Sequence, residues 1–254
     1  YESQLALIGR LIWERSSQAA PLFAVGSSGI EDALAAHWRE EGLLNDQFND
    51  RPLLPPLAPA SQVLAVSGSC SPVTARQINE AARGGYALIS LETPLLIDPE
   101  RSQEARGAAV EKALGLLRAG RSVILHSCLG PEDARVGATA RAFAALGYAP
   151  HEVRLKSGKL LGVQLGRTLQ VLLEASGVRR VVVAGGDTSG YIASELGITA
   201  LTMAAPLAPG APLCRAYAPG SALHGLEMAF KGGQVGKPDF FVTALHGAPT
   251  AHLT

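Results

Sequence analysis

The chain has 254 residues with 22 basic and 22 acidic side chains, so its formal net charge is zero. This balance argues against a broad charged surface for nucleic acid or anionic membrane, and we expect neither partner. Hydrophobic residues make up 47% of the chain, yet no apolar run is long enough to cross a bilayer. The sequence begins without Met or a signal-peptide pattern, so we expect a fragment or a numbering that starts inside a longer protein.

The three cysteines, Cys70, Cys128 and Cys214, are widely spaced and form no CxxC pair. We therefore expect free, buried thiols, no structural zinc site, and the reducing setting of the cytoplasm.

The N-terminal part predicts two helices around a short strand. Apolar side chains recur at helical spacing over residues 4–15 and 30–40, and residues 21–25 are typical of a strand. Residues 26–29 (GSSG) fit either a tight turn or an anion site at a helix N-terminus. Residues 46–62 lose periodicity and carry many prolines, so we expect a linker there, between a partial domain at 1–45 and a second domain at 63–254.

The second domain opens with a buried strand that runs into a turn rich in hydroxyl groups. This turn carries Ser67, Ser69 and Ser71, and Pro72 then lies where the first turn of a helix tolerates it. Small hydroxyls and free N–H groups at the end of a strand suit a phosphate, although the GxxxxGK[ST] pattern of a P-loop is absent. Helix capping by the serines, or a Ser or Cys nucleophile, are the other readings of this turn.

The middle of the domain continues the alternation of strands and helices. Strands are predicted at residues 86–91 and 122–127, and helices at 100–119, 139–146 and 155–176. The second of these strands ends near His126, for which two roles stay open: facing a ligand, or a hydrogen-bonded position at a strand end.

A second glycine-rich turn follows the valine-rich strand at residues 179–184. Gly185 and Gly186 allow backbone angles and a close approach that a Cβ forbids. Thr188 or Ser189 is expected to cap the helix that follows. Its first N–H groups, at the positive end of the helix dipole, suit a phosphate.

Asp187 lies inside this turn, where direct contact with a phosphate would be repulsive. We expect it instead to hold Mg²⁺, a water on that ion, or a sugar hydroxyl. It is also the one candidate for a catalytic role, and the alternative is a plain turn in which Asp187 caps the helix.

The C-terminal part contains the third glycine-rich turn. After an extended segment at residues 196–202, three prolines between residues 206 and 212 are expected to break the chain. A strand then leads into Gly232 and Gly233, flanked by Lys231 and Lys237, and a terminal helix follows. Lysines beside free N–H groups suit a phosphate, and a solvated surface turn is the alternative.

These elements predict an α/β fold with a mostly parallel sheet and helices on both faces. Ligands of such sheets bind beyond the carboxyl ends of the strands, so the glycine- and serine-rich turns are expected to gather there. Turns of this kind without a carboxylate or histidine cluster fit a polyanion site better than a hydrolytic one.

Three motifs, residues 67–74 (SGSCSPVT), 185–189 (GGDTS) and 231–241 (KGGQVGKPDFF), occur in the order found in the four-carbon acid sugar kinases, and the chain resembles that family. The resemblance covers residue 63 to the C-terminus as the nucleotide-binding domain. Residues 23–30 look like the end of the family's substrate-binding domain.

The resemblance implies ATP-dependent phosphorylation of threonate, erythronate or an oxo-tetronate at its terminal hydroxyl, with ATP and Mg²⁺ as cofactors. It implies that Ser69 contacts ATP, that residues 185–189 wrap the phosphates, and that Gly233 closes the site. A homodimer is left open.

Two features depart from the family. Its acidic opening motif, Asp-Asp-Leu-Thr-Gly-Ala, is absent, so the sugar-acid residues and the catalytic base are expected outside this chain, which by itself is expected to bind nucleotide without turnover. The third motif reads KGGQVG instead of KSGNFG. The competing hypotheses are a hydrolase or acyltransferase that uses Ser28, Ser69 or Cys70 beside a histidine, and a non-catalytic ligand-binding domain.

Overall fold

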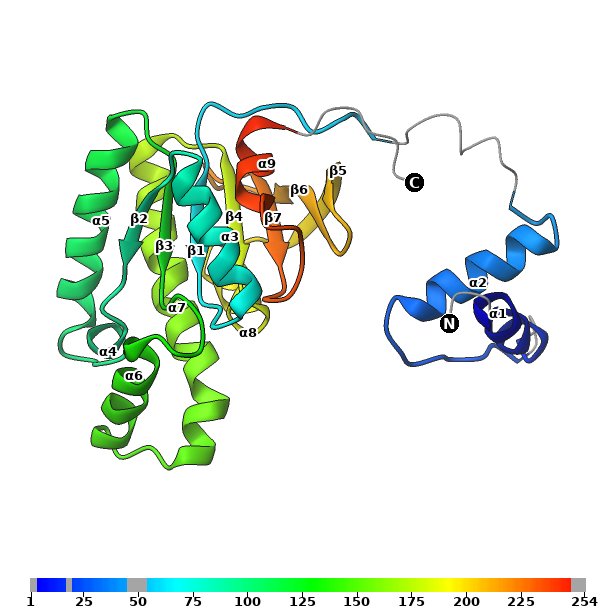
Figure 1. Cartoon of the computed structure of the whole chain (residues 1–254), viewed down its shortest axis with the longest axis horizontal. Helices are drawn as coiled ribbons and strands as arrows, with labels where there is room; N and C mark the ends of the chain where they lie inside the picture. The colour runs from blue at the N-terminus through cyan, green and yellow to red at the C-terminus, as the bar shows by residue number, and fades with distance from the viewer. Residues whose placement is uncertain (1–3, 17–19, 45–53, 248–254) are drawn as a thin grey trace. The chain divides into compact units, whose positions relative to one another are not determined.

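The computed structural model describes residues 4–16, 20–44 and 54–247 (Figure 1). The chain divides into two compact units, Tyr1–Leu53 and Leu54–Thr254. The division falls within the predicted linker at residues 46–62, of which 46–53 lie outside the described residues.

The first unit contains helices α1 (Leu5–Glu14) and α2 (Gly29–Glu40), both close to their predicted bounds. The rings of Trp13 and Trp38 meet edge to face at 5.3 Å between centroids. The predicted strand at residues 21–25 is wrong, because the described part of this unit offers no second strand to pair with it. Phe23 and Val25 of this segment are 91% and 99% exposed.

The second unit is built on a seven-stranded sheet with the order β2-β3-β1-β4-β7-β6-β5. The first five strands run parallel, and β6 and β5 are antiparallel to their neighbours. The parallel strands are β1 (Leu64–Ser67), β2 (Ala87–Ser90), β3 (Val123–His126), β4 (Arg180–Ala184) and β7 (Glu227–Lys231). The antiparallel pair is β5 (Ala200–Ala208) and β6 (Ala211–Tyr217).

Helices cover both faces of this sheet, so the predicted fold class is confirmed (Figure 1). One face carries α5 (Ser102–Arg118), α7 (Pro150–Ser176) and α8 (Gly186–Glu195); the other carries α3 (Pro72–Arg83) and α9 (Phe240–His246). Two further helices, α4 (Thr93–Leu96) and α6 (Ala134–Ala145), follow the carboxyl ends of β2 and β3. None of the helices in the described ranges is both long and apolar enough to span a membrane.

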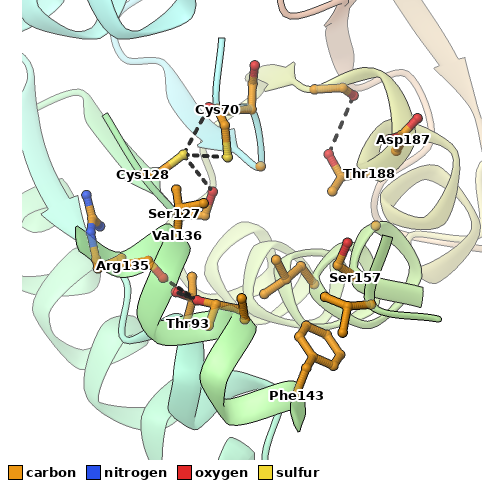
Figure 2. Close-up of a pocket in the computed structure, with 18 of the residues that line it drawn as sticks. Cys70, Thr93, Ser127, Cys128, Arg135, Val136, Phe143, Ser157, Asp187 and Thr188 are labelled. Carbon is orange, nitrogen blue, oxygen red and sulfur yellow. Dashed lines mark hydrogen bonds between the residues drawn. The ribbon is translucent and has the colours of Figure 1, made fainter. Parts of the chain in front are cut away.

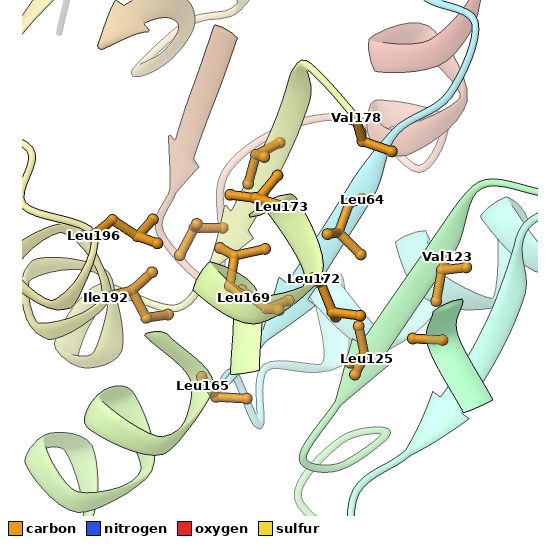
Figure 3. Close-up of a cluster of buried hydrophobic side chains, with 14 of the residues drawn as sticks. Leu64, Val123, Leu125, Leu165, Leu169, Leu172, Leu173, Val178, Ile192 and Leu196 are labelled. Atoms are coloured by element: carbon orange, nitrogen blue, oxygen red, sulfur yellow. The ribbon is translucent and has the colours of Figure 1, made fainter. Parts of the chain in front are cut away.

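The larger of two cores lies between the sheet and α7, as Figure 3 shows. Alternate residues of the parallel strands, such as Leu64 and Leu125, meet Leu165, Leu169 and Leu172 of α7, all fully buried. Burying leucines of this size contributes roughly 1.5–3 kcal/mol each. Strands β1, β3 and β4 are buried at every position, which explains their nearly unbroken apolar sequence.

Prolines 206 and 212 lie inside strands β5 and β6 and do not break the chain as predicted. Pro206 is tolerated because β5 is the outer strand and one of its edges needs no hydrogen bonds. Pro212 lies at a register irregularity and before the first pair that β6 forms with β7. Between the strands, Gly210 supplies the positive φ of 73° for the hairpin turn.

Glycines on α7 bring this helix unusually close to α8. Gly158, Gly162 and Gly166 recur every fourth residue and face α8. A Cβ at Gly162 would lie 2.8 Å from Tyr191 Cβ and 3.1 Å from the carbonyl oxygen of Thr188. The stripe contacts α8 from Asp187 to Glu195 and therefore sets the position of the whole helix.

Gly162→Ala is expected to destabilise the fold by about 1–3 kcal/mol, because the added methyl group has no room against α8. Gly107→Ala on α5 is the matched control, since a Cβ there meets nothing within 4 Å. The control should stabilise by up to about 1 kcal/mol through helix propensity. Urea unfolding measures both changes, and equal behaviour of the two variants would contradict the packing argument.

Candidate functional site

The turns after β1, β4 and β7 meet at the carboxyl edge of the sheet, as the parallel topology predicts. Backbone hydrogen bonds continue past the strands: Gly68 N–H donates to the carbonyl of Ala184 at 2.9 Å, and Gly185 N–H donates to that of Lys231 at 2.9 Å. The three motifs therefore form one connected layer of loops.

The side chain of Thr188 packs between the first two turns. Thr188 is 3% exposed, and its side chain fills the space between Gly68 and Gly185. A Cβ at Gly68 would lie 2.6 Å from Thr188 Cγ2, and one at Gly185 would lie 2.6 Å from Thr188 Oγ1. Both glycines are needed for close packing.

The two glycines of the second turn have different roles. Gly185 has a φ of 138°, which side-chain-bearing residues rarely adopt. Gly186 does not have a positive φ, and a Cβ at this position would meet no protein atom within 4 Å. The expectation of special backbone angles is therefore correct for Gly185 and wrong for Gly186, which only leaves open space above the start of α8.

The N-terminus of α8 is left without a side-chain cap. The helices that follow β1 and β3 differ: Ser71 Oγ accepts from Val73 N–H at 3.1 Å to cap α3, and Asp133 Oδ1 accepts from Arg135 N–H at 3.0 Å to cap α6. In α8 the N-cap is Gly185, so the first N–H groups of this helix are free for a ligand or water.

The predicted cap of α8 by Thr188 or Ser189 is wrong. The helix begins at Gly186, so both residues lie in its first turn instead of before it. Their hydroxyls point back: Ser189 Oγ donates to the carbonyl of Gly185, and Thr188 Oγ1 lies 3.5 Å from the same oxygen.

A cavity of about 400 Å³ opens over this uncapped helix end (Figure 2). Five of the ten residues predicted to bind a cofactor line it: Ser69, Gly185, Gly186, Asp187 and Thr188. The exposed carboxylate of Asp187 is the one acidic group among the described lining residues. A space of this size is in the range that small-molecule ligands occupy.

The other five predicted residues support the cavity without lining it. Ser67 Oγ accepts from Ser69 N–H at 3.4 Å within the first turn, and Ser71 caps α3. Gly233, which follows Gly232, packs against the first motif, where a Cβ would lie 2.6 Å from Ser69 Oγ. The fifth, Ser189, bonds within α8.

The third turn is held against α3 by two buried polar side chains. Gln77 Nε2 donates to the carbonyls of Val235 and Gly236 at 3.0 and 2.9 Å. Lys231, which is 1% exposed, donates to Thr74 Oγ1 and to the carbonyl of Gly232, each at 3.0 Å. Burial lowers the pKa of Lys231 to about 8. Its role in the free chain is thus to order the turn, and the surface-turn reading of this lysine does not hold.

The far wall of the cavity is apolar and comes from α6 and the first half of α7. It is formed by Val136, Ala140, Phe143, Val153 and Leu161. In Figure 2, Phe143 lies across the opening from Asp187 and Thr188. The cavity therefore has a polar end at the turns and an apolar end between the helices.

An ion pair orders the loop between β3 and α6. Arg135 binds both carboxylate oxygens of Asp133, at 3.0 Å from Nε and 2.6 Å from Nη2, and also donates to the carbonyl of His126 at 3.0 Å. These hydrogen bonds hold the pKa of Asp133 well below its usual range. The loop is thus fixed in place beside the cavity.

His126 is a buried, hydrogen-bonded residue at a strand end, which answers the question left open by the sequence. Its Nδ1 lies 3.2 Å from Arg135 Nη2, and a guanidinium only donates, so Nδ1 accepts and the ring proton is on Nε2. Nε2 in turn lies 3.4 Å from Ser90 Oγ. Within the described ranges no hydrogen bond joins a histidine to Ser69, Cys70 or Ser28, so the arrangement that a hydrolase requires is not formed there.

Stability is expected to fall between pH 6.5 and 4 because of His126. Burial, followed by the charge of Arg135, lowers its pKa from 6.5 to about 4. The unfolded chain therefore binds more protons than the folded chain in this window, and acid favours unfolding. At pH 5 the loss relative to pH 7 is about 2 kcal/mol from this group.

Urea unfolding at pH 7 and pH 5 measures this loss. His126→Gln removes the titrating ring, so its two unfolding free energies should differ by about 2 kcal/mol less than those of the wild type. An undiminished difference in the variant would assign the acid sensitivity to other groups.

The sequence alone did not identify the apolar wall, Arg135 or Ser157 as parts of the site. The wall residues are ordinary core residues in sequence, and only the crossing of α6 over α7 turns them toward a cavity. Arg135 follows Asp133 by two residues, a spacing that allows Asp133 both to cap α6 and to form an ion pair with Arg135. This spacing was the one signal in the sequence that could have identified Arg135.

The family model for a nucleotide-binding C-terminal domain matches residues 64–241. The chain is 43% identical over 240 residues to a 3-oxo-isoapionate kinase of Paraburkholderia graminis, covering 94% of this chain and 49% of that protein. It is 32% identical over 246 residues to a 3-oxo-tetronate kinase of Methylobacterium radiotolerans, covering 96% and 51%. The chain thus spans about half the length of the curated relatives that it matches.

Among solved structures, a Salmonella typhimurium protein provisionally described as a tRNA synthase superposes with a TM-score of 0.61 at 24% identity, covering 96% of this chain and 50% of that one. At this identity the likeness concerns the fold alone. The family model covers more than half of the chain and contains all three motifs. The chain therefore belongs to the family of nucleotide-binding C-terminal domains, as the resemblance to the four-carbon acid sugar kinases predicted.

Proposed function

We propose that this chain is the nucleotide-binding half of an ATP-dependent kinase that phosphorylates a small sugar acid at its terminal hydroxyl. The observation that supports this most is the uncapped N-terminus of α8, which opens into a cavity of about 400 Å³. Residues 63–254 would form the nucleotide-binding domain, 46–62 a linker, and 1–45 the end of a substrate-binding domain. The family match at residues 64–241 supports the bounds proposed for the nucleotide-binding domain.

The two ends of the cavity suit the two ends of ATP. The phosphates would lie at the free N–H groups of Gly186 and Asp187, where the helix dipole stabilises negative charge. The adenine would lie against the apolar wall that includes Val136 and Phe143. Ser69 would border the phosphates, and Gly233 would hold Ser69 in place from the third turn.

The donor set of the cavity fits Mg²⁺ that arrives with ATP. Across the described residues, no group of three or more His, Cys, Asp or Glu side chains could hold a metal by itself. Mg²⁺ typically uses one or two carboxylates together with phosphate oxygens and water. Asp187 would be that carboxylate, with the hydroxyl of Ser157 on the same cavity wall. When bound, Mg²⁺ neutralises charge that develops on the transferred phosphoryl group.

The substrate class follows from the relatives. Two of them act on 3-oxo-isoapionate and 3-oxo-tetronate, so we expect a short 3-oxo sugar acid, with threonate and erythronate as the alternatives. We assign the acid site and the base that accepts the hydroxyl proton to the half of the relatives that this chain does not span. The part played by this chain is to bind and orient the nucleotide.

We further propose a cytoplasmic setting, which the three free cysteines support. A homodimer is supported by exposed apolar side chains on the two outermost strands at the β5 end of the sheet, Leu201 and Met203 on β5 and Tyr217 on β6. Light scattering measures the oligomeric state.

ADP release by the full-length gene product tests the kinase. With ATP, Mg²⁺ and 3-oxo-isoapionate or 3-oxo-tetronate, we expect turnover far above the rate without acid. If the protein binds ATP but releases no more ADP in the presence of either acid than in its absence, a non-catalytic ligand-binding protein is favoured instead.

A further inference from the structure

Two cysteines face each other in the cavity wall. Cys70 follows β1 and Cys128 follows β3, and these strands are neighbours in the sheet. Their sulfur atoms are 3.0 Å apart, and Cys128 Sγ also lies 3.4 Å from the carbonyl oxygen of Ser69 (Figure 2). The expectation of three buried thiols is correct for Cys128, which is 2% exposed, and wrong for Cys70, which is exposed, while Cys214 is half-buried.

The surroundings activate one sulfur of this pair. The hydrogen bond between the two thiols, followed by that from Ser127, lowers the pKa of Cys128 to about 7. The same contact raises the pKa of Cys70, because the pair shares one proton. A thiolate is the reactive form of cysteine, so this pair holds a nucleophile and a second thiol in contact with it.

The third cysteine has none of these features. Cys214 lies on β6, burial raises the pKa of its thiol, and its Sγ lies 3.9 Å from the carbonyl oxygen of Pro212. It is therefore a built-in control for oxidation of the pair.

We propose that Cys70 and Cys128 are a redox-active dithiol that peroxide converts to a disulfide, and that this disulfide weakens nucleotide binding. The Cys128 thiolate attacks one peroxide oxygen and displaces hydroxide, which leaves a sulfenic acid. Cys70 sulfur then attacks the sulfenic sulfur and displaces a second hydroxide, and the two thiol protons complete two waters. One hydrogen peroxide is reduced by two electrons, which come from the two sulfurs.

The link to the nucleotide rests on the proposed function of the cavity. Both sulfurs line it together with Ser69, so bonding them acts directly on its wall. A disulfide brings the sulfurs to about 2.05 Å, which pulls the first turn toward β3. Cys128 Sγ lies 3.4 Å from the carbonyl oxygen of Ser69, so this movement shifts Ser69, which is also the residue against which Gly233 packs. Oxidation thereby disturbs both the first and third motifs.

Peptide mapping under non-reducing conditions tests the dithiol without any nucleotide. After treatment of the chain with equimolar hydrogen peroxide, we expect a linked peptide pair containing Cys70 and Cys128, with Cys214 still free. Cys214→Ser should retain the link, Cys70→Ser and Cys128→Ser should lose it, and dithiothreitol should reverse it. Three free thiols, or separate oxidation of each cysteine without a link, would overturn the proposal.

Calorimetric titration of the oxidised and reduced Cys214→Ser chain with an ATP analogue tests whether the disulfide weakens nucleotide binding. We expect the oxidised form to bind about tenfold more weakly, equivalent to about 1.4 kcal/mol. Equal affinities would overturn the coupling while leaving the mapped disulfide intact. Failure of the reduced form to bind, repeated with the full-length protein, would overturn both the coupling and the nucleotide assignment, and the mapping would still decide whether the dithiol exists.

Discussion

Gly186→Val is expected to abolish nucleotide binding while the chain keeps its fold. Gly186 is exposed, needs no positive φ, and has no protein atom within 4 Å of the position of a Cβ. The new side chain therefore fits the free protein and instead occupies the space above the start of α8. Affinity for a fluorescent ATP analogue should fall by at least a hundredfold, about 2.7 kcal/mol.

Gly185→Val is the matched control, because it is expected to destabilise the fold, whereas Gly186→Val is expected to block the ligand and leave the fold intact. Its φ of 138° and the 2.6 Å approach to Thr188 Oγ1 leave no room for a side chain. Strain of this kind costs about 1–3 kcal/mol, before the clash is added. Thermal unfolding should show a large loss for Gly185→Val and little change for Gly186→Val. Normal nucleotide binding by a folded Gly186→Val chain would rule out phosphate contact at this helix end.

Asp187→Asn is expected to lower the rate of phosphoryl transfer by the full-length protein about a hundredfold or more, in line with the loss of a group that acts on transition-state charge. The side chain of Asp187 lines the cavity and is exposed, and within the described part of the chain its carboxylate forms no hydrogen bond or ion pair. Asn keeps the size and removes the charge, so the change isolates the proposed contact with Mg²⁺. Steady-state ADP release as a function of Mg²⁺ concentration measures it.

The competing role of Asp187 is electrostatic support of the helix. An acidic residue in the first turn contributes about 0.3–1 kcal/mol through the helix dipole. Asp32→Asn is the matched control, because Asp32 lies in the first turn of α2 in the other unit. If both variants lose the same small stability and neither changes Mg²⁺ dependence, Asp187 is structural only.

The parallel part of the fold could be predicted because three of its strands, β1, β3 and β4, are buried at every position. Leu64–Ser67 and Arg180–Ala184 read as apolar runs bounded by glycine or serine, which is typical of strands in the middle of such a sheet. The edges were less predictable. Pro206 looks like a chain breaker in sequence, and only its place on the outer strand makes it acceptable there.

The polar end of the site could likewise be predicted, because the turn chemistry is local. The glycines and hydroxyls that line or support the cavity occur in short contiguous motifs. The apolar end could not, because Phe143 and Leu161 join it only through the packing of α6 on α7. The glycine stripe at Gly158, Gly162 and Gly166 is visible in sequence once its partner, α8, is known.

Nucleotide binding at the α8 end of the cavity is the central claim, and calorimetric titration of this chain with a non-hydrolysable ATP analogue and Mg²⁺ tests it most directly. We predict one site per chain, weaker binding by Asp187→Asn, and no detectable heat with Gly186→Val. Undiminished binding by both variants would move the nucleotide to another surface. No binding by a folded wild-type chain, repeated with the full-length protein, would contradict the claim itself.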